Sequence, residues 1–168
     1  MSEIRIEELT SKLLPAVTEI FNHYIVHSTA SFHIKPLTVV EMAVKRSLGN
    51  PHYNSFAIFC DDELVGYSAI FPWKGPEAYD ATAEVSVYLK PEMTGLGIGN
   101  KALAHLEIVA ANRGLKNLVA GICTENTESI KLFERNGYLP VAHFKGIGYK
   151  FGRDLDVIYL QKKLRSDL

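Results

Sequence analysis

The amino-acid sequence predicts a single α/β domain over residues 1–168, with a mixed, largely antiparallel central sheet. Segments with the apolar alternation of a strand are interspersed with segments whose apolar residues recur at helical spacing. The predicted order is β-α-α-β-β-β-α-β-α-β-β, and its three consecutive strands indicate an antiparallel meander. The chain has no internal repeat, low-complexity tract or linker, and 168 residues with 47% apolar composition suffice for one core.

The predicted elements follow one another closely along the chain. They are a strand in 3–9, helices in 13–28 and 37–50, a hairpin in 55–73, a strand in 79–91, a helix from the glycine-rich 93–99 to Gly114, a strand in 116–123, a helix in 124–138, and strands in 138–150 and 155–164. Pro15 suits the first turn of the first helix. Thr38 with Glu41 three residues later is typical of the start of the second. Thr124 or Asn126 is expected to cap the last helix.

Charge and hydropathy exclude several classes of partner. The formal net charge is −1, and basic residues form nothing longer than the pairs Lys45-Arg46 and Lys162-Lys163. This composition does not indicate binding to nucleic acid or to an anionic membrane surface. The N-terminus lacks the form of a signal peptide, and no apolar stretch is long enough to span a bilayer. We therefore expect a cytoplasmic protein with no membrane partner.

Three alternating glycines, Gly95, Gly97 and Gly99, precede or open a helix, where unpaired N–H groups and the helix dipole favour anions. Missing side chains let a diphosphate approach these N–H groups. A dinucleotide and coenzyme A are the two candidates. The stretch from Gly97 to Ala102 fits the dinucleotide pattern G-x-G-x-x-A, but an antiparallel meander precedes it, and Val119 occupies the place expected for an acidic residue. No Gly-Lys-Ser/Thr follows, which excludes a P-loop.

Longer stretches carry a resemblance to a known family. "AEVSVYLKPEMTGLGIGNKAL" followed by "NTESIKLFERNGY" resembles the acetyl-CoA-binding core of the GNAT superfamily of N-acetyltransferases. "IFNHYIVHSTASF", "FPWKG" and "GYKFGRDLDVIYLQ" are similar to its phosphinothricin and methionine sulfoximine N-acetyltransferase branch, so the resemblance covers nearly the whole chain. It implies a GNAT-like fold, acetyl-CoA as co-substrate, no metal, and acetylation of the α-amine of a small amino acid-like substrate by direct attack.

The resemblance also assigns residues to the cofactor. It implies that one strand lies along the pantetheine arm, that the glycine loop binds the diphosphate, and that Asn126 reaches the cofactor from the following helix. The strand residues are Val87, Tyr88 and Leu89, and the loop residues are Gly95, Leu96, Gly97, Ile98, Gly99 and Asn100.

Glu84 is the expected general base, because it matches the glutamate that acts in this branch directly or through a water. The pattern by itself is also typical of a strand whose wet face carries Glu84, Ser86 and Tyr88. The backbone N–H of Val87 is expected to donate to the thioester oxygen.

Two of the departures from the family pattern concern the cofactor and the general acid. Thr94 stands where Arg or Gln is usual, so main-chain amides are expected to supply more of the affinity for the cofactor. Phe133 stands where many members carry a tyrosine, and it cannot donate a proton. Tyr138, Tyr149 or a water remain alternatives for the general acid.

The resemblance places a substrate loop at residues 73–76, with Lys74 holding the carboxylate of the acceptor, although a solvated lysine in a turn is the alternative. The full set of expected substrate residues is Lys74, Gly75, Pro76, Glu84, Val85 and Ser86. Other acceptors, namely a polyamine, an aminoglycoside or a protein N-terminus, stay open, as does a CoA-binding sensor without turnover.

The last two strands suggest a homodimer. His23 and His27 lie one helical turn apart without a third ligand, so no metal site is predicted.

Overall fold

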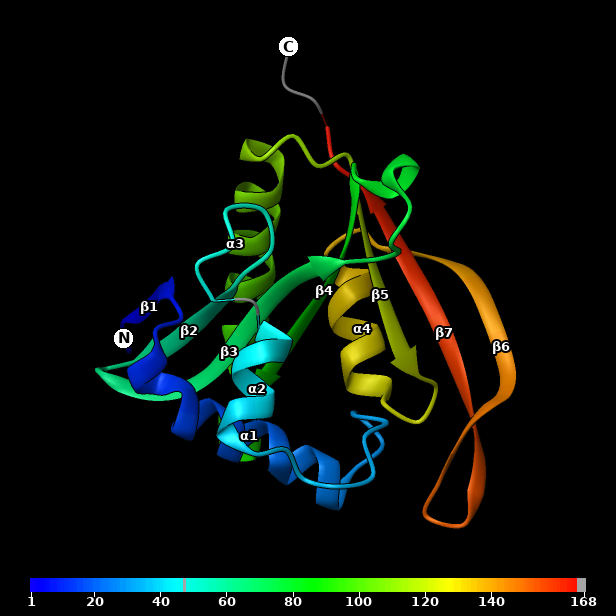
Figure 1. Ribbon diagram of the computed structural model, residues 1–168, viewed down its shortest axis with the longest axis horizontal. Coiled ribbons are helices and arrows are strands. Elements are labelled where there is room, and N and C mark those ends of the chain that lie inside the picture. Colours follow the sequence, from blue (N-terminus) through cyan, green and yellow to red (C-terminus); the bar gives the residue numbers. More distant parts are fainter. Residues whose placement is uncertain (47, 166–168) are drawn as a thin grey trace.

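The computed structural model describes residues 1–46 and 48–165 and confirms the predicted order of helices and strands (Figure 1). The elements are β1 (Ile4–Glu8), α1 (Leu14–His27), α2 (Val39–Arg46), β2 (Ser55–Cys60), β3 (Glu63–Pro72), β4 (Thr82–Leu89), α3 (Ile98–Asn112), β5 (Asn117–Cys123), α4 (Thr127–Arg135), β6 (Leu139–Lys150) and β7 (Arg153–Lys163). Three short 3₁₀ turns, Ser11–Leu13, Glu77–Tyr79 and Pro91–Met93, were not predicted.

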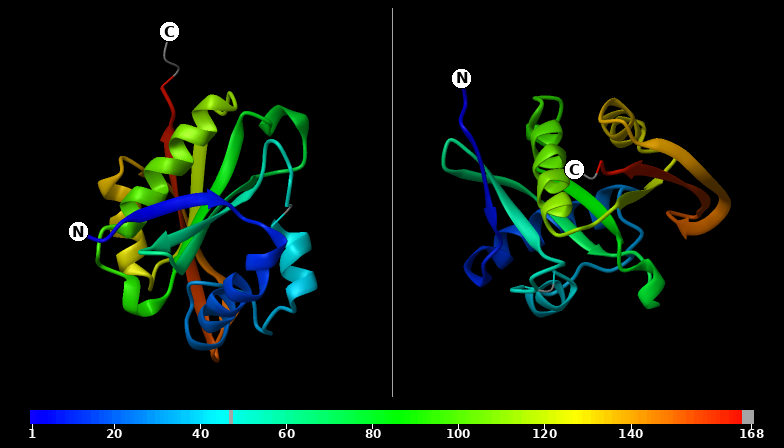
Figure 2. Two further views of the ribbon diagram at one scale, coloured as in Figure 1. Left: turned by 90° about the vertical axis from the view of Figure 1, so that its left-hand side faces the viewer. Right: turned by 90° about the horizontal axis from the view of Figure 1, so that it is seen from above.

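The described strands form one seven-stranded sheet in the order β1-β2-β3-β4-β5-β7-β6. Only β4 and β5 are parallel, and the other neighbours are antiparallel, which confirms a mixed, largely antiparallel sheet. Figure 2 shows α3 and α4 on one face of the sheet and α1 and α2 on the other. A right-handed crossover through a helix is the usual way to bring two parallel strands together, and α3 provides this connection here.

Local hydrogen bonds explain where two of the helices begin. The Thr38 N–H donates to a carboxylate oxygen of Glu41 over 2.8 Å, and the Glu41 N–H donates to the Thr38 hydroxyl over 3.2 Å, which is the expected capping box. Asn126, rather than Thr124, caps α4, because its side-chain oxygen accepts from the Ser129 N–H over 3.3 Å. The helix expected over 37–50 is shorter and ends at Arg46. No described helix is long and apolar enough to cross a bilayer.

Strand β4 contributes to the packing on both faces of the sheet. Ala83 and Val85 are buried in the cluster that includes Leu103 of α3, whereas Tyr88 packs on the opposite side with the cluster that includes Phe21 of α1. Side chains of a strand alternate between faces, so Glu84, Ser86 and Tyr88 share the face toward α1. The strand is thereby fixed between two layers, and its backbone is held in place at the centre of the molecule.

Strands β4 and β5 separate after a short paired region. Their parallel register covers only Thr82–Glu84 against Asn117–Val119, although β4 continues to Leu89 and β5 to Cys123. Each remains paired on its other side, β4 with β3 and β5 with β7. Figure 1 shows the two strands diverging from their common end. The facing edges beyond this point therefore have no strand partner, and such an edge is able to receive a ligand.

Candidate active site

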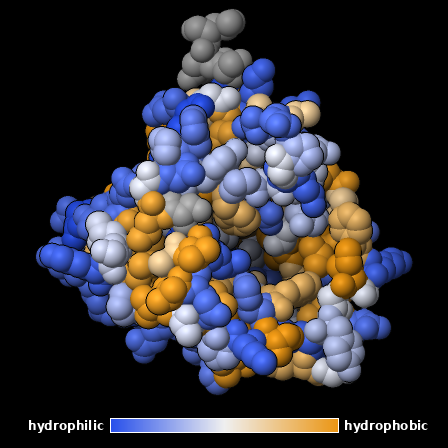
Figure 3. All heavy atoms as spheres, in the orientation of Figure 1, coloured by the Kyte–Doolittle hydropathy of each residue, from blue (hydrophilic) through white to orange (hydrophobic). Residues whose placement is uncertain are grey.

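A cavity of about 700 Å³ occupies the space that opens between β4 and β5. Figure 3, in the orientation of Figure 1, shows a hollow near the middle of the molecule, where Figure 1 places α4. The volume lies within the range typical of small-molecule sites. The lining residues come from β4, β5, the glycine loop and α4, with two from α1 and the loop that follows it: Tyr24, Ala30, Val85, Ser86, Val87, Tyr88, Leu89, Thr94, Gly95, Gly97, Gly99, Asn100, Ala120, Gly121, Ile122, Asn126, Glu128, Ser129, Leu132, Phe133 and Arg135.

The start of α3 points unpaired N–H groups toward one end of this cavity. Gly97 is the N-cap residue, with φ +82° and ψ 0°, and no side chain caps the helix. A Cβ added to Gly97 would meet no atom within 4 Å, so the space beside this backbone is open. The first N–H groups of a helix lack intrahelical acceptors and carry the positive end of its dipole. The arrangement fits an anion that approaches the main chain closely.

Gly99 lines the cavity and also lies against α4. A Cβ at this position would lie 3.0 Å from Cδ2 of Leu132 in α4, so the missing side chain lets the two helices approach. The side-chain amide of Asn136 also donates to the side-chain oxygen of Asn100 over 2.8 Å. The C-terminal end of α4 is thereby fixed beside the first turn of α3.

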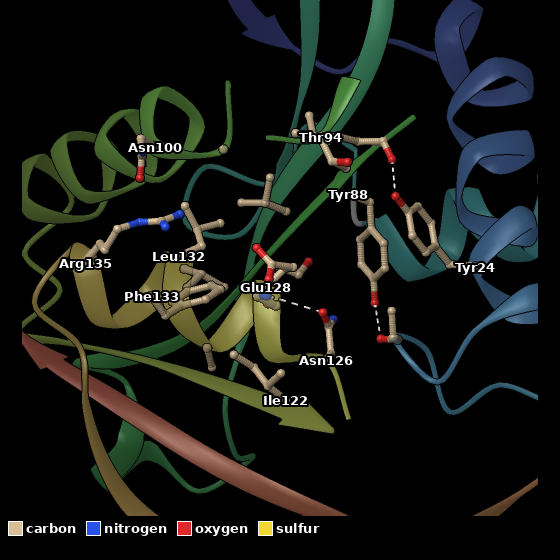
Figure 4. A pocket seen from close by; sticks show the side chains of 18 of the residues that line it. Tyr24, Tyr88, Thr94, Asn100, Ile122, Asn126, Glu128, Leu132, Phe133 and Arg135 are labelled. Carbon is tan, nitrogen blue, oxygen red and sulfur yellow. Dashed lines mark hydrogen bonds between the residues drawn. The ribbon is translucent and has the colours of Figure 1, made fainter. Parts of the chain in front are cut away.

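One face of α4 lines the cavity opposite the glycine loop. Glu128, Leu132 and Arg135 follow one another at helical spacing, and all three lie along the cavity (Figure 4). Asn126 contributes from the residue that caps the helix. Of the predicted loop residues, the side chain of Ile98 is buried in the core and Leu96 is exposed, and neither lines the cavity. Because the Ile98 side chain is buried, a ligand can contact this residue only through its backbone.

Glu84 lies where β4 and β5 separate. It is the last β4 residue in the register with β5, opposite Val119, and it is partly buried. Burial raises the pKa of its carboxyl group, and this effect outweighs the lowering by a hydrogen bond from the Gly121 N–H and by the charges of Lys74 and Lys45. Glu84 itself does not line the cavity, but the next residue, Val85, does. A raised pKa makes a carboxylate beside a cavity a better proton acceptor.

The neighbouring Gly121 leaves space for an aromatic ring. A Cβ on Gly121 would lie 2.9 Å from the Tyr159 ring, so a larger residue would displace that ring. Burial raises the pKa of Tyr159, and the charge of Glu84 raises it further. The hydroxyl of Ser86, on the same face of β4 as Glu84, is buried without a hydrogen-bond partner among the described residues. Glu84, Ser86, Gly121 and Tyr159 therefore surround the point where the strands part.

The tyrosines at the cavity already have hydrogen-bond partners. The Tyr88 hydroxyl donates to the Ala30 carbonyl over 3.0 Å, and the Tyr24 hydroxyl donates to the carbonyl of Leu89 (Figure 4). Burial raises the pKa of Tyr88 to about 12, which keeps its hydroxyl protonated at neutral pH.

Among the alternatives for the general acid, Tyr138 is buried with its ring 4.9 Å from the ring of Phe133, and burial raises its pKa. Phe133 itself lines the cavity, whereas Tyr149 is largely exposed on β6. Neither Tyr138 nor Tyr149 belongs to the described cavity lining.

The predicted substrate loop lies at the surface before β4. Lys74, Gly75 and Pro76 are exposed and do not line the cavity, but the charge of Lys74 lowers the pKa of Glu84. Lys45 of α2 has the same effect and was not predicted. Two positive charges from distant parts of the chain thus act electrostatically on Glu84, the candidate base.

Several cavity residues were missed from the sequence. The β5 residues Ala120 to Ile122 and Tyr24 become part of the site only through the divergence of the strands and the packing of α1, for which the sequence carries no local signal. The α4 residues had a usable signal, because 128, 132 and 135 share one helix face with the predicted Asn126 nearby.

Comparison with known proteins agrees with this geometry. The model of the acetyltransferase (GNAT) family matches residues 16–138. The chain is 31% identical over 156 residues to an L-methionine sulfoximine/L-methionine sulfone acetyltransferase of Salmonella typhimurium, covering 89% of this chain and 88% of that protein. It is 31% identical over 159 residues to a phosphinothricin N-acetyltransferase of Streptomyces viridochromogenes, covering 95% and 87%.

Among solved structures, a GNAT superfamily phosphinothricin acetyltransferase of Sinorhizobium meliloti in complex with AcCoA superposes with a TM-score of 0.89 at 26% identity. The superposition covers 97% of this chain and 88% of that one. The family match extends from α1 through the glycine loop to the end of α4, and so includes the described cavity. The chain therefore belongs to the acetyltransferase (GNAT) family and is an enzyme of that class with acetyl-CoA as its co-substrate.

Proposed function

We propose that this enzyme transfers the acetyl group of acetyl-CoA directly to the α-amine of a small amino acid-like acceptor of the phosphinothricin or methionine sulfoximine type. The observation that carries the proposal is the position of Glu84 where β4 and β5 part, one residue before Val85, which lines the same cavity as the glycine loop. Relatives named for acetylation of these two compounds support the acceptor class.

In the proposed complex the cofactor extends along the unpaired edge of β4. The backbone of residues 87–89 pairs with the amide groups of the pantetheine arm, in the manner of an added strand. The N–H groups of the loop before α3 bind the diphosphate, and the side chain of Asn126 contacts the arm from the α4 side. This placement directs the thioester toward Glu84, and holding amine and thioester in line contributes up to about 7 kcal/mol of barrier reduction.

The chemistry requires a neutral amine and a polarised carbonyl. Acetyl-CoA supplies the activated acyl group when it is bound. Glu84 accepts a proton from the acceptor's ammonium group, directly or through a water, and the freed amine attacks the thioester carbon. The N–H of Val87 donates to the oxygen on which negative charge develops, until the C–S bond breaks. As the C–S bond breaks, the nitrogen releases its remaining extra proton to water and the departing thiolate takes a proton from water, because Phe133 offers none and the hydroxyls of Tyr24 and Tyr88 are engaged with backbone carbonyls.

Lys74 is proposed to hold the carboxylate of the acceptor. Replacing it by methionine removes a charge-assisted contact, and we expect KM for the acceptor to rise about 10-fold or more. The acid limb of the pH–rate profile should also move to higher pH, because the charge of Lys74 lowers the pKa of Glu84 and its loss lets that pKa rise. Steady-state kinetics between pH 5 and 9 measure both effects. If neither KM nor the decrease of the rate at low pH changes, Lys74 contacts solvent and not the acceptor.

The acceptor class is tested with a panel of amines. Thiol release from acetyl-CoA is followed with phosphinothricin, methionine sulfoximine, methionine sulfone, free amino acids, spermidine, an aminoglycoside and a peptide N-terminus, and each product is identified by mass. Turnover confined to α-amino acids and their analogues supports the proposal. Preferential turnover of spermidine or the aminoglycoside would show that the acceptor is cationic instead, and CoA binding without any turnover would favour a sensor.

The cytoplasmic location stays a prediction, which cell fractionation tests.

We also infer that two copies pair through β6. This edge strand and the turn after it expose Val141, Phe144, Ile147, Tyr149 and Phe151, and Figure 3 shows hydrophobic residues over β6 and β7 at the right margin. Exposed apolar patches of this kind mark association surfaces.

Ile147→Glu is expected to convert a dimer into a monomer, because it places a charge in the apolar contact. The molar mass from light scattering at micromolar concentration measures the change. Val44→Glu, on α2 and 78% exposed, is the control and should leave the mass unaltered. A monomeric wild type, or a dimer that survives Ile147→Glu, would contradict the inference.

A further inference from the structure

The end of the cavity that is proposed to bind the phosphates has little positive charge from the protein. Coenzyme A carries a diphosphate and a 3′-phosphate, whereas Thr94, which begins the loop, is neutral and uses its hydroxyl to donate to the Pro91 carbonyl over 2.8 Å. Lys90, just before the loop, pairs with Glu63 over 2.7 Å. The other residues that line this end of the cavity, Gly95, Gly97, Gly99 and Asn100, are also neutral, so their N–H groups would meet several negative charges.

The described residues that line the cavity include two charged side chains, Glu128 and Arg135. Glu128 pairs with Lys131 on its own helix over 3.2 Å. Arg135 takes part in none of the ion pairs or side-chain hydrogen bonds among the described residues. An exposed guanidinium is thus available for a ligand in the cavity.

The position of Arg135 on α4 brings it to the end of the cavity that lies beside the loop before α3. Its neighbour Asn136 is hydrogen-bonded to Asn100 in the first turn of α3, and Leu132 packs against Gly99. Figure 4 shows the Arg135 side chain extending toward Leu132, on the side of the cavity where Asn100 lies. The cation therefore lies beside the helix start whose N–H groups face the same space, while Glu128 lies near the other end of α4.

We propose that Arg135 pairs with the diphosphate of coenzyme A and supplies the positive charge that Thr94 lacks. The inference rests on the proposed orientation of the cofactor, with its diphosphate at the loop before α3. A guanidinium presents a rigid fork of donors that matches phosphate oxygens, so the contact adds charge and direction to the backbone N–H groups.

Titration calorimetry with CoA and with 3′-dephospho-CoA tests this assignment. Arg135→Ala and Arg135→Gln are expected to raise Kd about 10-fold or more for both ligands, because both retain the diphosphate. The dependence of Kd on salt concentration should also become shallower in both variants. Lys116→Ala, an exposed cation after the far end of α3, outside the cavity lining and in none of the ion pairs among the described residues, is the control and should bind like the wild type.

The outcomes separate this inference from the proposed function. Equal affinity of wild type and Arg135 variants overturns the role of Arg135, and a lower melting temperature without a change in Kd identifies a helix-stabilising residue at the C-terminal end of α4. A loss confined to CoA overturns the diphosphate assignment, since the guanidinium would then recognise the 3′-phosphate. Failure of the wild type itself to bind either ligand contradicts the proposed cofactor orientation rather than the choice of Arg135.

Discussion

Gly97→Val is expected to raise Kd for CoA by about 100-fold or more, because it removes at least two charge-assisted contacts to the diphosphate. Gly97 has φ +82° and lines the cavity, and a Cβ added to it would meet no atom within 4 Å. A valine there fills the space into which the phosphates must come and forces the N-cap of α3 out of its conformation, at a cost of about 1–2 kcal/mol for a β-branched residue. Titration calorimetry with CoA measures the loss.

Gly114→Val is the matched control for backbone strain. Gly114 has φ +80°, also has no atom within 4 Å of an added Cβ, and follows the opposite end of α3. The two variants should lose similar unfolding free energy, but only Gly97→Val should lose CoA binding. Gly97→Ala, which is milder, keeps the test valid if the valine variant does not fold. Normal CoA affinity of both Gly97 variants would show that the loop is not the diphosphate site.

Glu84→Gln is expected to lower kcat by about 10²-fold or more at neutral pH while Kd for CoA stays unchanged. Glutamine retains an oxygen that can accept from the Gly121 N–H, so the change removes the proton acceptor with little effect on shape. Rapid-mixing measurement of thiol release, together with CoA titration, separates the chemical step from cofactor binding.

The pH profile gives an independent test of the same residue. Since burial raises the pKa of Glu84, the rate should fall as pH drops through a value above the usual range of a carboxyl group, about 4.3. This decrease of the rate at low pH should be absent in Glu84→Gln. It should remain in the control Glu19→Gln, which changes an exposed carboxyl group of α1. If Glu84→Gln matches the wild-type rate at every pH, another group or a solvent water is the base.

Local chemistry made much of the fold predictable. The Thr38–Glu41 capping box and the Asn126 cap involve residues three apart in sequence, so residue type marks the first helix start and narrows the second to Thr124 or Asn126. The alternation of β4 likewise placed Glu84, Ser86 and Tyr88 on one face. The open glycine backbone before α3 follows from Gly97, which adopts a conformation that other residues rarely enter.

The features that shape the site depend on distant contacts and could not be predicted in this way. The divergence of β4 and β5 depends on how many residues pair across the sheet, and no local pattern encodes where that pairing stops. Gly99 lines the cavity as expected, but its close packing against Leu132, some thirty residues later in a different helix, could not be predicted. The influence of Lys45 on Glu84 similarly arises from the packing of α2 beside the sheet.

The most direct test of the proposed cofactor site is a crystal structure of the complex with CoA. We expect diphosphate oxygens within about 3.2 Å of backbone nitrogens in the loop before α3. The pantetheine arm should lie between β4 and β5, with its sulfur nearest Glu84. A diphosphate bound away from this loop, or a sulfur on the far side of the sheet from Glu84, would contradict it.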